Sequence, residues 1–222
     1  MGNEKVIIVG TTMFSGELQY ILMHSGIEVI GFSVDEAYIK SHNFCNLPVY
    51  PFEKIDRYVD MAKTKILLAI GYSEMNNHRM EKYLYCKEKG YKIYSFCSNK
   101  AIILTENIGE GNIIMPGSYV GPYSKLGVCN VIRAGAVLSH HDIVGNYNWI
   151  ADGCIIGGGI TIGNNCFIGL GSTIRNEITV SDYSFIGAHS YLGHETKLHS
   201  VHYGVPAKLI ENQDSIEKIK KV

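Results

Sequence analysis

An aliphatic side chain recurs at every sixth residue from Ile102 to Leu198, over 17 consecutive positions without an insertion or deletion. The residue after each aliphatic position is often glycine, and the fourth residue after it is usually small. This period matches neither an α-helix, which repeats every ~3.6 residues, nor a strand, whose side chains alternate between two faces. It is typical of a hexapeptide-repeat solenoid, in which each repeat forms one short strand and one corner.

Three such repeats close one triangular coil of 18 residues, so residues that are 18 apart in the chain are expected to stack on one another. The aliphatic side chains point into the prism, and the stacked coils pair their strands in parallel around one continuous core. Glycine at the corners lets the chain turn, because it adopts a positive φ at little cost. The pattern therefore predicts a solenoid over residues 99–210.

The first part of the chain has a different pattern, in which short apolar runs alternate with amphipathic stretches. The apolar runs predict strands at 5–10, 27–33, 65–70 and 91–96, and the stretches between them predict helices at 14–25 and 75–89. This alternation is typical of a small doubly wound parallel sheet of the α/β class, expected over residues 1–98. After the solenoid, a helical tail is expected over 211–222, with Asp214 as N-cap and an apolar stripe of Ile216, Ile219 and Val222.

The composition is that of a globular protein, with 222 residues, 46% hydrophobic and 18% charged, and a net charge of −1. The lack of a long basic run argues against nucleic acid as a partner. The sequence has no stretch of 18 apolar residues and no signal-peptide pattern, so a cytoplasmic protein without a membrane partner is expected. The six cysteines form no CxxC pair and are expected to be reduced thiols.

Three stretches follow the predicted strands of the α/β domain, at the edge where parallel sheets bind their ligands. Gly10, Thr11 and Thr12 follow the first strand, Asp35 follows the second, and Gly71 follows the third. The first stretch lacks the middle glycine of a dinucleotide fingerprint, but backbone amides and the start of the next helix can still bind a phosphate there. Asp35 can accept hydrogen bonds from a ribose or a base. A tight turn without a ligand and a solvated acid are the alternatives for the first two stretches.

The most unusual part of the solenoid is residues 138–145, where two histidines and an acid share one corner. His140 is expected to stack between Pro122 and Gly158, which lie one coil before and one coil after it. The glycines at 157–159 leave a notch without side chains beside the imidazole, which suits an extended ligand that carries amides. Histidine side chains titrate near neutral pH, so they can take a proton from an attacking amine or hydroxyl. A pair of surface histidines in a glycine-rich turn is the alternative.

Several segments carry a resemblance to a known family: residues 140–145 (HHDIVG), 158–163 (GGITIG) and 204–208 (GVPAK), with Val34-Asp35, Pro48-Val49 and residues 71–79 in the α/β part. On these segments nearly the whole chain resembles the bacterial nucleotide-sugar acyltransferases, which join a Rossmann-like domain to a left-handed parallel β-helix. That family includes N-acetyltransferases of UDP-, dTDP- and GDP-linked amino sugars and the sialic-acid O-acetyltransferases. The resemblance implies transfer of an acetyl group from acetyl-CoA to a sugar amine, for surface polysaccharides such as O-antigen or lipopolysaccharide, by a homotrimer without a metal.

The resemblance also implies roles for individual residues. Counting five residues back from Gly145 puts the catalytic base on His140. In the family an acid directly follows the base, whereas here His141 follows it and Asp142 comes next, so either histidine remains a candidate for the base. An amide of Gly158 or Gly159 would stabilise the oxyanion. The implied contacts to CoA are Gly158, Gly159, Gly169, Gly187 and Lys208, and those to the nucleotide sugar are Gly10, Thr11, Thr12, Asp35, Gly71, Tyr72, Asn76 and Arg79.

Three other functions are compatible with the same repeats. A sugar hydroxyl could replace the amine as acceptor, since the sequence does not separate the two. A zinc enzyme of the γ-carbonic-anhydrase kind would use a pair of histidines with four residues between them, for which His194 and His199 are candidates. A non-catalytic trimeric scaffold or nucleotide-sugar sensor would bind the same ligands without acyl transfer.

Overall fold

The computed structural model describes residues 5–221, which divide into two compact units. The first unit comprises the chain up to Gly71 together with Glu81–Tyr94. The second comprises Tyr72–Met80 and the chain from Ser95 onward. The first unit thus ends at Tyr94 and is interrupted by the short segment Tyr72–Met80, which packs with the solenoid. The helix expected at 75–89 is observed as the 3₁₀ turn η3 (Ser73–Asn76) and the helix α2 (Asn77–Glu88).

The first unit is an α/β sheet whose strand order is β3-β4-β2-β1-β5. Four of its strands are parallel, and the short β3 pairs antiparallel with β4 at the edge. The strands are β1 (Lys5–Val9), β2 (Glu28–Val34), β3 (Asn43–Phe44), β4 (Leu47–Pro51) and β5 (Thr64–Leu68). They are connected by the helix α1 (Met13–His24) and the 3₁₀ turns η1 (Glu36–Tyr38) and η2 (Phe52–Arg57). The aliphatic run of β1 is buried between its two neighbours, as its continuous apolar sequence predicts.

The sheet differs from the expectation in two places. Residues 91–96 do not add a strand to it: Ile93 makes one isolated bridge to Ile66, and β6 (Phe96–Cys97) pairs with a strand of the second unit. The pair of strands β3 and β4 was not expected. Pro48 and Pro51 make β4 look unlike a strand in sequence, because proline cannot donate to a ladder and is confined to sheet edges and strand ends.

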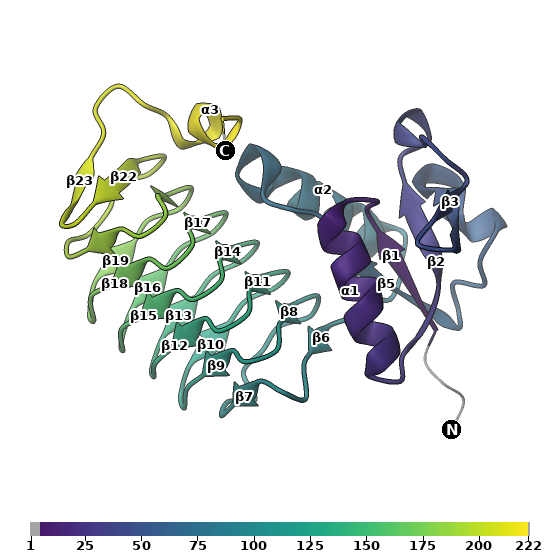
Figure 1. Ribbon diagram of the computed structural model, residues 1–222, viewed down its shortest axis with the longest axis horizontal. Helices are drawn as coiled ribbons and strands as arrows, with labels where there is room; N and C mark the ends of the chain where they lie inside the picture. The colour runs from purple at the N-terminus through teal and green to yellow at the C-terminus, as the bar shows by residue number, and fades with distance from the viewer. Residues whose placement is uncertain (1–4, 222) are drawn as a thin grey trace. The chain divides into compact units, whose positions relative to one another are not determined.

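The second unit is a parallel β-helix built from two-residue strands (Figure 1). Strands that are one coil apart in the sequence pair in register, as Ile132 does with Ile150 and Ile150 with Ile168. The strands form three sheets, with orders β10-β13-β16-β19, β21-β18-β15-β12-β9-β7 and β23-β22-β20-β17-β14-β11-β8-β6. Their bounds are β7 Ile102–Ile103, β8 Ile113–Ile114, β9 Tyr119–Val120, β10 Lys125–Leu126, β11 Val131–Ile132, β12 Val137–Leu138, β13 Ile143–Val144, β14 Trp149–Ile150, β15 Ile155–Ile156, β16 Thr161–Ile162, β17 Phe167–Ile168, β18 Thr173–Ile174, β19 Thr179–Val180, β20 Phe185–Ile186, β21 Tyr191–Leu192, β22 Val201–Gly204 and β23 Ala207–Leu209.

The aliphatic ladder forms the core of this β-helix. All 14 of its positions from Ile114 to Leu192 are buried, which confirms the period of six. Its two end positions are not part of the core, because Ile102 is 57% exposed and Leu198 is 62% exposed. The final coil is shortened, so Ile186 pairs with His202 instead of Gly204, and His202 takes the inward place of an aliphatic residue.

The end of the chain closes the β-helix. Strands β22 and β23 form an antiparallel hairpin, and the short helix α3 (Ser215–Ile219) follows it. Asp214 caps α3 by accepting a hydrogen bond from the amide of Ile216 at 2.8 Å, as expected. Ile219 is buried, whereas Val222 lies outside the described residues.

The six cysteines are free thiols, as expected. Cys154 and Cys166 occupy small-residue positions of the repeat and are completely buried. Burial raises the pKa of Cys154 to about 11 and that of Cys166 to about 12, so both stay protonated and act as small packing groups. Within residues 5–221, no helix combines the length and apolarity needed to cross a membrane.

Candidate active site

The loop after β1 is a tight turn that only glycine can form at its first residue. Gly10 has a φ of +122°, and a Cβ there would lie 2.7 Å from both the carbonyl oxygen of Ala69 and Oγ of Ser15. Oγ of Ser15 accepts a hydrogen bond from the amide of Thr12 at 3.2 Å and donates to the carbonyl of Ala69 at 3.3 Å. These bonds hold Thr12 at the start of α1, with its side chain exposed.

The other two predicted stretches lie at the same edge of the sheet, because β1 pairs in parallel with both β2 and β5. Asp35 follows β2 and forms an ion pair with Lys82, so it is not a solvated acid. The Lys82 ammonium also lies 4.5 Å from the centroid of the Phe52 ring. A hollow of about 500 Å³ is lined by residues of η1 and β4 and by the turn after η2, among them Glu36, Tyr50 and Tyr58. The three stretches therefore share the carboxyl edge of the sheet, with Gly71 after β5.

The segment Tyr72–Met80 belongs to the β-helix unit and contradicts the expected role of its polar residues. Asn76 and Arg79 are completely buried. The Arg79 guanidinium donates to the carbonyls of Cys129, Tyr147 and Asn148 and to Oδ1 of Asn76, at 2.8–3.2 Å. Asn76 donates in turn to the carbonyl of Cys166 at 3.1 Å. Because these groups are used by the β-helix backbone, Asn76 and Arg79 anchor the segment and are not free to bind a sugar nucleotide.

Tyr72 has the same structural role. Its ring packs against the rings of Trp149 and Phe167, with centroids 5.1 and 4.9 Å apart. Trp149, Phe167 and Phe185 are three of the outward side chains of the eight-stranded sheet, and all three are buried. The anchored segment thus covers an apolar face of the β-helix, and Tyr72 contributes apolar contact there.

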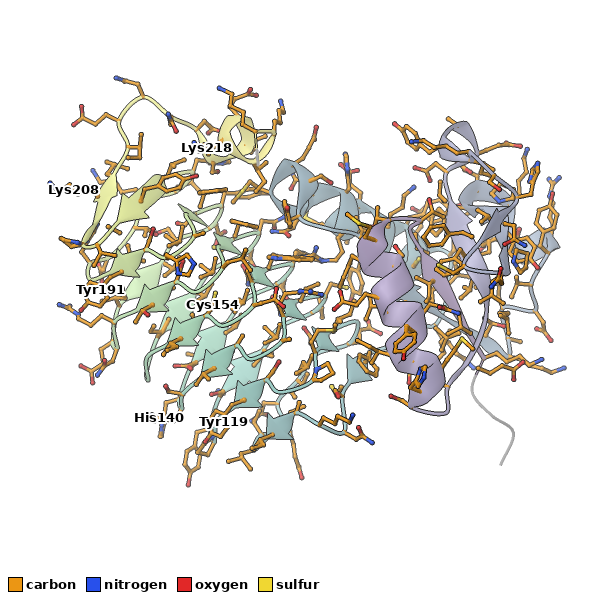
Figure 2. All side chains as sticks on the ribbon, in the orientation of Figure 1. Tyr119, His140, Cys154, Tyr191, Lys208 and Lys218 are labelled. Atoms are coloured by element: carbon orange, nitrogen blue, oxygen red, sulfur yellow. The ribbon has the colours of Figure 1, made fainter. Side chains whose placement is uncertain are left out.

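A second candidate region, the histidine corner, consists of His140, His141 and Gly158. Both histidines are exposed, and Figure 2 shows His140 at the outer edge of the coils. Nδ1 of His140 lies 3.1 Å from Nδ1 of His141, and the two rings are nearly perpendicular. Two nitrogens in hydrogen-bond contact share one proton. When His140 donates from Nδ1, its Nε2 is left without a proton and can act as a base.

The conformation of His141 is set by the coil before it. Its φ is +56°, in the left-handed region, and its amide donates to the carbonyl of Pro122 at 3.0 Å. Its ring stacks on that of Tyr123, with centroids 4.7 Å apart. Tyr123 precedes His141 by one full coil, so the repeat spacing could have revealed this contact in the sequence, although it was missed. Lys82, the partner of Asp35, was also missed, and the helical pattern around it gives no such signal.

Gly158 forms the floor beneath His140. A Cβ on Gly158 would lie 2.4 Å from Cε1 and 2.7 Å from Nε2 of the imidazole, so the notch expected from the glycine run is present and filled by the ring. The amide of Gly159 donates to the carbonyl of His140 at 2.8 Å. That bond leaves the Gly158 amide as the better oxyanion donor of the expected pair.

Asp142 turns away from the histidines into the coil. It is completely buried, and its Oδ1 accepts a hydrogen bond from the amide of Ile160 at 3.1 Å. Its Oδ2 is buried without a hydrogen-bond partner among the described residues. Burial raises the pKa of Asp142 to about 6, against the opposing effects of the Ile160 amide and of His140. Within the described residues no hydrogen bond joins Asp142 to His140, and the neighbour that contacts the His140 ring nitrogen is His141.

The remaining expected CoA contacts lie elsewhere on the β-helix. Gly169 and Gly187 follow the eight-stranded sheet, whereas His140 and Gly158 follow the six-stranded sheet, so one chain does not bring them to the same corner. Both Gly169 and Gly187 are buried, and a Cβ on Gly187 would lie 2.0 Å from the ring of Tyr203. Lys208 is exposed on β23, at the far end of the coils from His140 (Figure 2).

The two histidines of the zinc alternative have separate surroundings. His199 stacks on Tyr183, and its Nδ1 lies 3.5 Å from Oδ2 of Asp214. The ring of His194 instead lies 5.4 Å from that of His202. Among residues 5–221, no group of three or more potential ligand side chains is arranged to hold a metal.

Comparisons with known proteins agree with this architecture. Residues 143–176 match the family model described as bacterial transferase hexapeptide, six repeats. No curated protein matches the chain. Three similar solved structures cover almost all of it. A histidine-to-alanine mutant of GDP-perosamine N-acetyltransferase from Caulobacter crescentus, in complex with CoA and GDP-perosamine, is 19% identical, with a TM-score of 0.85 over 96% of this chain and 98% of that one.

The other two similar structures have comparable coverage. The acetyltransferase domain of PglB from Neisseria gonorrhoeae, in complex with acetyl coenzyme A, is 19% identical, with a TM-score of 0.84 over 94% of this chain and 100% of that one. WeeI from Acinetobacter baumannii is 18% identical, with a TM-score of 0.82 over 92% of this chain and 99% of that one. The fold is thus that of the hexapeptide-repeat acetyltransferases, and the predicted class, an α/β domain followed by a left-handed parallel β-helix, is confirmed.

Proposed function

We propose that this protein transfers an acetyl group from acetyl-CoA to the amine of a nucleotide-linked amino-deoxy sugar, with His140 as the general base. The observation that carries the proposal is the histidine corner. An exposed imidazole lies against a glycine floor, with its Nδ1 3.1 Å from Nδ1 of His141 and its Nε2 beside Gly158. The N-acetyltransferases of similar fold support this reaction class, and one of them was solved as a histidine mutant with CoA and its amino sugar bound.

In the proposed reaction, the lone pair of the sugar amine attacks the carbonyl carbon of the thioester. A new C–N bond forms, and Nε2 of His140 takes the amine proton. The amide of Gly158 stabilises the negative charge on the carbonyl oxygen. The C–S bond then breaks, and the proton passes to the CoA thiolate, so that the products are the acetamido sugar and CoA. The transfer is direct, without an acyl-enzyme and without a metal.

His141 takes the place of the orienting acid in this mechanism. Because Nδ1 of His141 lies 3.1 Å from Nδ1 of His140, His141 can accept the His140 proton and fix the tautomer that leaves Nε2 basic. The bond of the His141 amide to Pro122 and the ring contact with Tyr123 hold the accepting ring in place. His140 is therefore the better candidate for the base, and His141 for its positioning partner.

The α/β unit would hold the nucleotide diphosphate. Gly10, Thr11 and Thr12 would present backbone amides to phosphate at the start of α1. Asp35, with its partner Lys82, would contact the ribose or base, and Gly71 would lie at the same edge. Lys208 would reach the adenosine end of CoA. The family resemblance supports a cytoplasmic reaction in a bacterium that builds surface polysaccharides.

A homotrimer completes the proposal, because Gly169, Gly187 and Lys208 do not share a corner with His140 in one chain. The outward side chains of the six-stranded sheet include Val137, Ile155 and Tyr191, and they offer an apolar strip to a neighbouring subunit. Ile155 is 51% exposed in the single chain. Sedimentation analysis should give a trimer, and a stable, active monomer would exclude a site shared between subunits.

The reaction is tested by thiol release from acetyl-CoA with a panel of UDP-, dTDP- and GDP-linked 3- and 4-amino-6-deoxy sugars. Each amino sugar is paired with its hydroxy counterpart as a control. Rapid release with one amino sugar, and its acetylation by mass spectrometry, is the expected result. Release only with a hydroxy sugar would make the protein an O-acetyltransferase. Binding of both ligands without release would make it a scaffold or sensor.

A further inference from the structure

One position of the hexapeptide repeat, the fourth residue after each aliphatic position, has a shared hydrogen-bonding pattern. Seven side chains at this position donate to a backbone carbonyl at the corresponding place in the next coil. The pairs are Asn112 to Gly127, Ser118 to Arg133, Asn130 to Gly145, Asn148 to Gly163, Cys154 to Gly169, Cys166 to Ser181 and Ser172 to Gly187. At these seven positions the next coil therefore presents a carbonyl group to a side chain that can donate, whereas Ala136, Ile160 and Ile178 fill the same repeat position without a donor.

The three asparagines at this position also accept a hydrogen bond through Oδ1. This second bond shows which end of the side-chain amide faces which backbone group. In each, Oδ1 accepts from the amide of the residue one coil further on, at 2.7–2.9 Å, while Nδ2 makes the donor bond. Asn130, for example, accepts from the amide of Asn148 and donates to the carbonyl of Gly145. The two ends of the planar amide thus face an amide and a carbonyl of the next coil.

Asp142 occupies the same repeat position and makes only the first of these two bonds. Its Oδ1 accepts from the amide of Ile160, one coil further on, as an asparagine would. Its Oδ2 takes the place of the asparagine nitrogen, is completely buried and has no hydrogen-bond partner among the described residues. By the same spacing as in the seven pairs, the carbonyl that belongs to this position is that of Gly157. An ionised carboxylate would set a second negative oxygen against this carbonyl, at a substantial cost in a buried place.

We propose that the folded protein holds Asp142 as a neutral carboxylic acid whose Oδ2–H donates to the carbonyl of Gly157. Gly157 begins the glycine run that forms the floor beneath His140. Asp142 then acts as a positioning residue, because its proton fixes the backbone that carries the Gly158 amide. This catalytic meaning depends on the proposed function, whereas the protonation state of Asp142 does not.

Burial also agrees with a neutral acid, because it raises the pKa of Asp142 to about 6. The backbone amides of Ile160, Gly159 and Ser139 act in the opposite direction, as does a positive charge on His140, and burial outweighs them. Ser124 in the coil before and Ile160 in the coil after are not titratable, and His140 favours the carboxylate only when its ring is protonated.

The protonation state can be measured directly by infrared difference spectroscopy of the wild-type protein against Asp142→Asn, without ligands, as the pH is varied. The expected difference is the carbonyl band of a protonated carboxylic acid that is half lost only above pH ~6, whereas an ordinary aspartate is ionised at that pH. A carboxylate band alone at pH ~5.5 would overturn the proposal. Because no substrate is present, failure of the proposed acetyl transfer would not affect this result.

The positioning role is tested by restoring or removing the donor. Asp142→Asn keeps a donor in the same place, so kcat should stay within about threefold of wild type and should no longer fall as the acid ionises. Asp142→Leu removes the donor, and kcat should fall about 10-fold or more with KM for acetyl-CoA little changed. Equal loss of activity in both variants would mean that the carboxylate itself is needed, and would overturn the role.

Asn130→Asp provides a matched control in the same repeat position, away from His140. It should gain the infrared band of a protonated acid, since the carbonyl of Gly145 faces it as Gly157 faces Asp142. Its activity should follow the wild-type pH profile. A pH profile altered as in the Asp142 variants would show that any buried acid in the β-helix has the same effect, and would contradict a special role for Asp142.

Discussion

Two clusters of polar side chains on the β-helix unit look equally functional in sequence and have opposite surroundings in the structure. Asn76 and Arg79 are completely buried, and three backbone carbonyls accept from the guanidinium. His140 and His141 are exposed, and the hydrogen bond between their rings uses Nδ1 of each and does not involve Nε2. The first cluster holds the segment Tyr72–Met80 on the β-helix, and the second would supply the base of the proposed reaction.

The difference lies in how completely the protein itself satisfies each polar group. A buried donor must be paired within the fold, so a cluster with full internal pairing contributes stability and has no group left for a substrate. An exposed imidazole on a glycine floor costs little to fold and keeps a nitrogen for chemistry. Substitutions in the two clusters should therefore have different effects: those in the first should lower stability, and those in the second should lower turnover.

The largest effect is expected for His140→Ala. Removal of the general base should lower kcat by about two to four orders of magnitude, while the melting temperature and CoA binding stay near wild type, because the side chain is exposed. Thiol release measures kcat, scanning calorimetry measures the melting temperature and titration calorimetry measures the binding of CoA. His141→Ala is the matched comparison and should lose less, since it orients the base. A larger loss in His141→Ala than in His140→Ala would exchange their roles.

The converse is expected for Arg79→Met. The exchange leaves the carbonyls of Cys129, Tyr147 and Asn148 without their donor, so the free energy of unfolding should fall by about 3–5 kcal/mol. Urea denaturation measures this change, and Arg57→Met, at an exposed arginine, serves as the control. A loss below ~1 kcal/mol together with weaker nucleotide-sugar binding would mean that Arg79 contacts the substrate. The two clusters would then not differ in the way described.

The sequence predicts the β-helix almost completely because each rung of the ladder repeats the same local requirement. Where that requirement changes, the prediction fails: Leu198 keeps the period of six, yet the shortened last coil places His202 inward instead. The α/β sheet is predicted less well. Its strand β4, which pairs with both β2 and β3, contains two prolines, and the pairing of such a strand depends on its neighbours more than on its own sequence.

The candidate site is predicted in part for the same reason. The constant length of the coil brings His140 onto Gly158, and this contact follows from counting alone. The burial of Arg79 does not, because the segment Tyr72–Met80 reaches the β-helix through contacts between residues 50–90 positions apart. Motif resemblance indicates that these residues are important, but only their hydrogen-bond partners distinguish a residue that anchors the segment from one that binds a ligand.

A smaller effect is expected for Gly158→Ala, which sharpens the comparison from the side of the glycine floor. The new Cβ would lie 2.4 Å from Cε1 of His140, so the imidazole must move. A displacement of this size should lower kcat about 10- to 100-fold with little change in stability. Gly193→Ala is the control, since its Cβ would approach only the exposed Tyr191 ring, at 3.2 Å. Equal activity in both variants would mean that the position of His140 is unimportant.

The smallest effect is expected at His202, a histidine that combines the burial of the anchor cluster with an incomplete set of partners. Its Nε2 lies 3.0 Å from Oγ of Ser200, while its buried Nδ1 has no hydrogen-bond partner among the described residues. Burial, together with the nearby His194, lowers the pKa of His202 from 6.5 to about 4. The folded state thus favours the neutral ring, and its contribution to stability is complete above pH 6.5 and is lost as the pH falls toward 4.

His202→Leu should remove this dependence by returning an aliphatic residue to the ladder opposite Ile186. The free energy of unfolding of the variant minus that of wild type should be about 1–2 kcal/mol larger at pH ~5 than at pH ~7.5. The reason is that His202 takes up a proton at pH ~5 in the unfolded wild-type chain but not in the folded one. Urea denaturation at the two pH values measures the gain, and His189→Gln, at an exposed histidine, should behave as wild type. If this difference is absent, buried His202 does not make the stability of the protein depend on pH. The incomplete pairing of its ring would then cost less free energy than the comparison of the two clusters suggests.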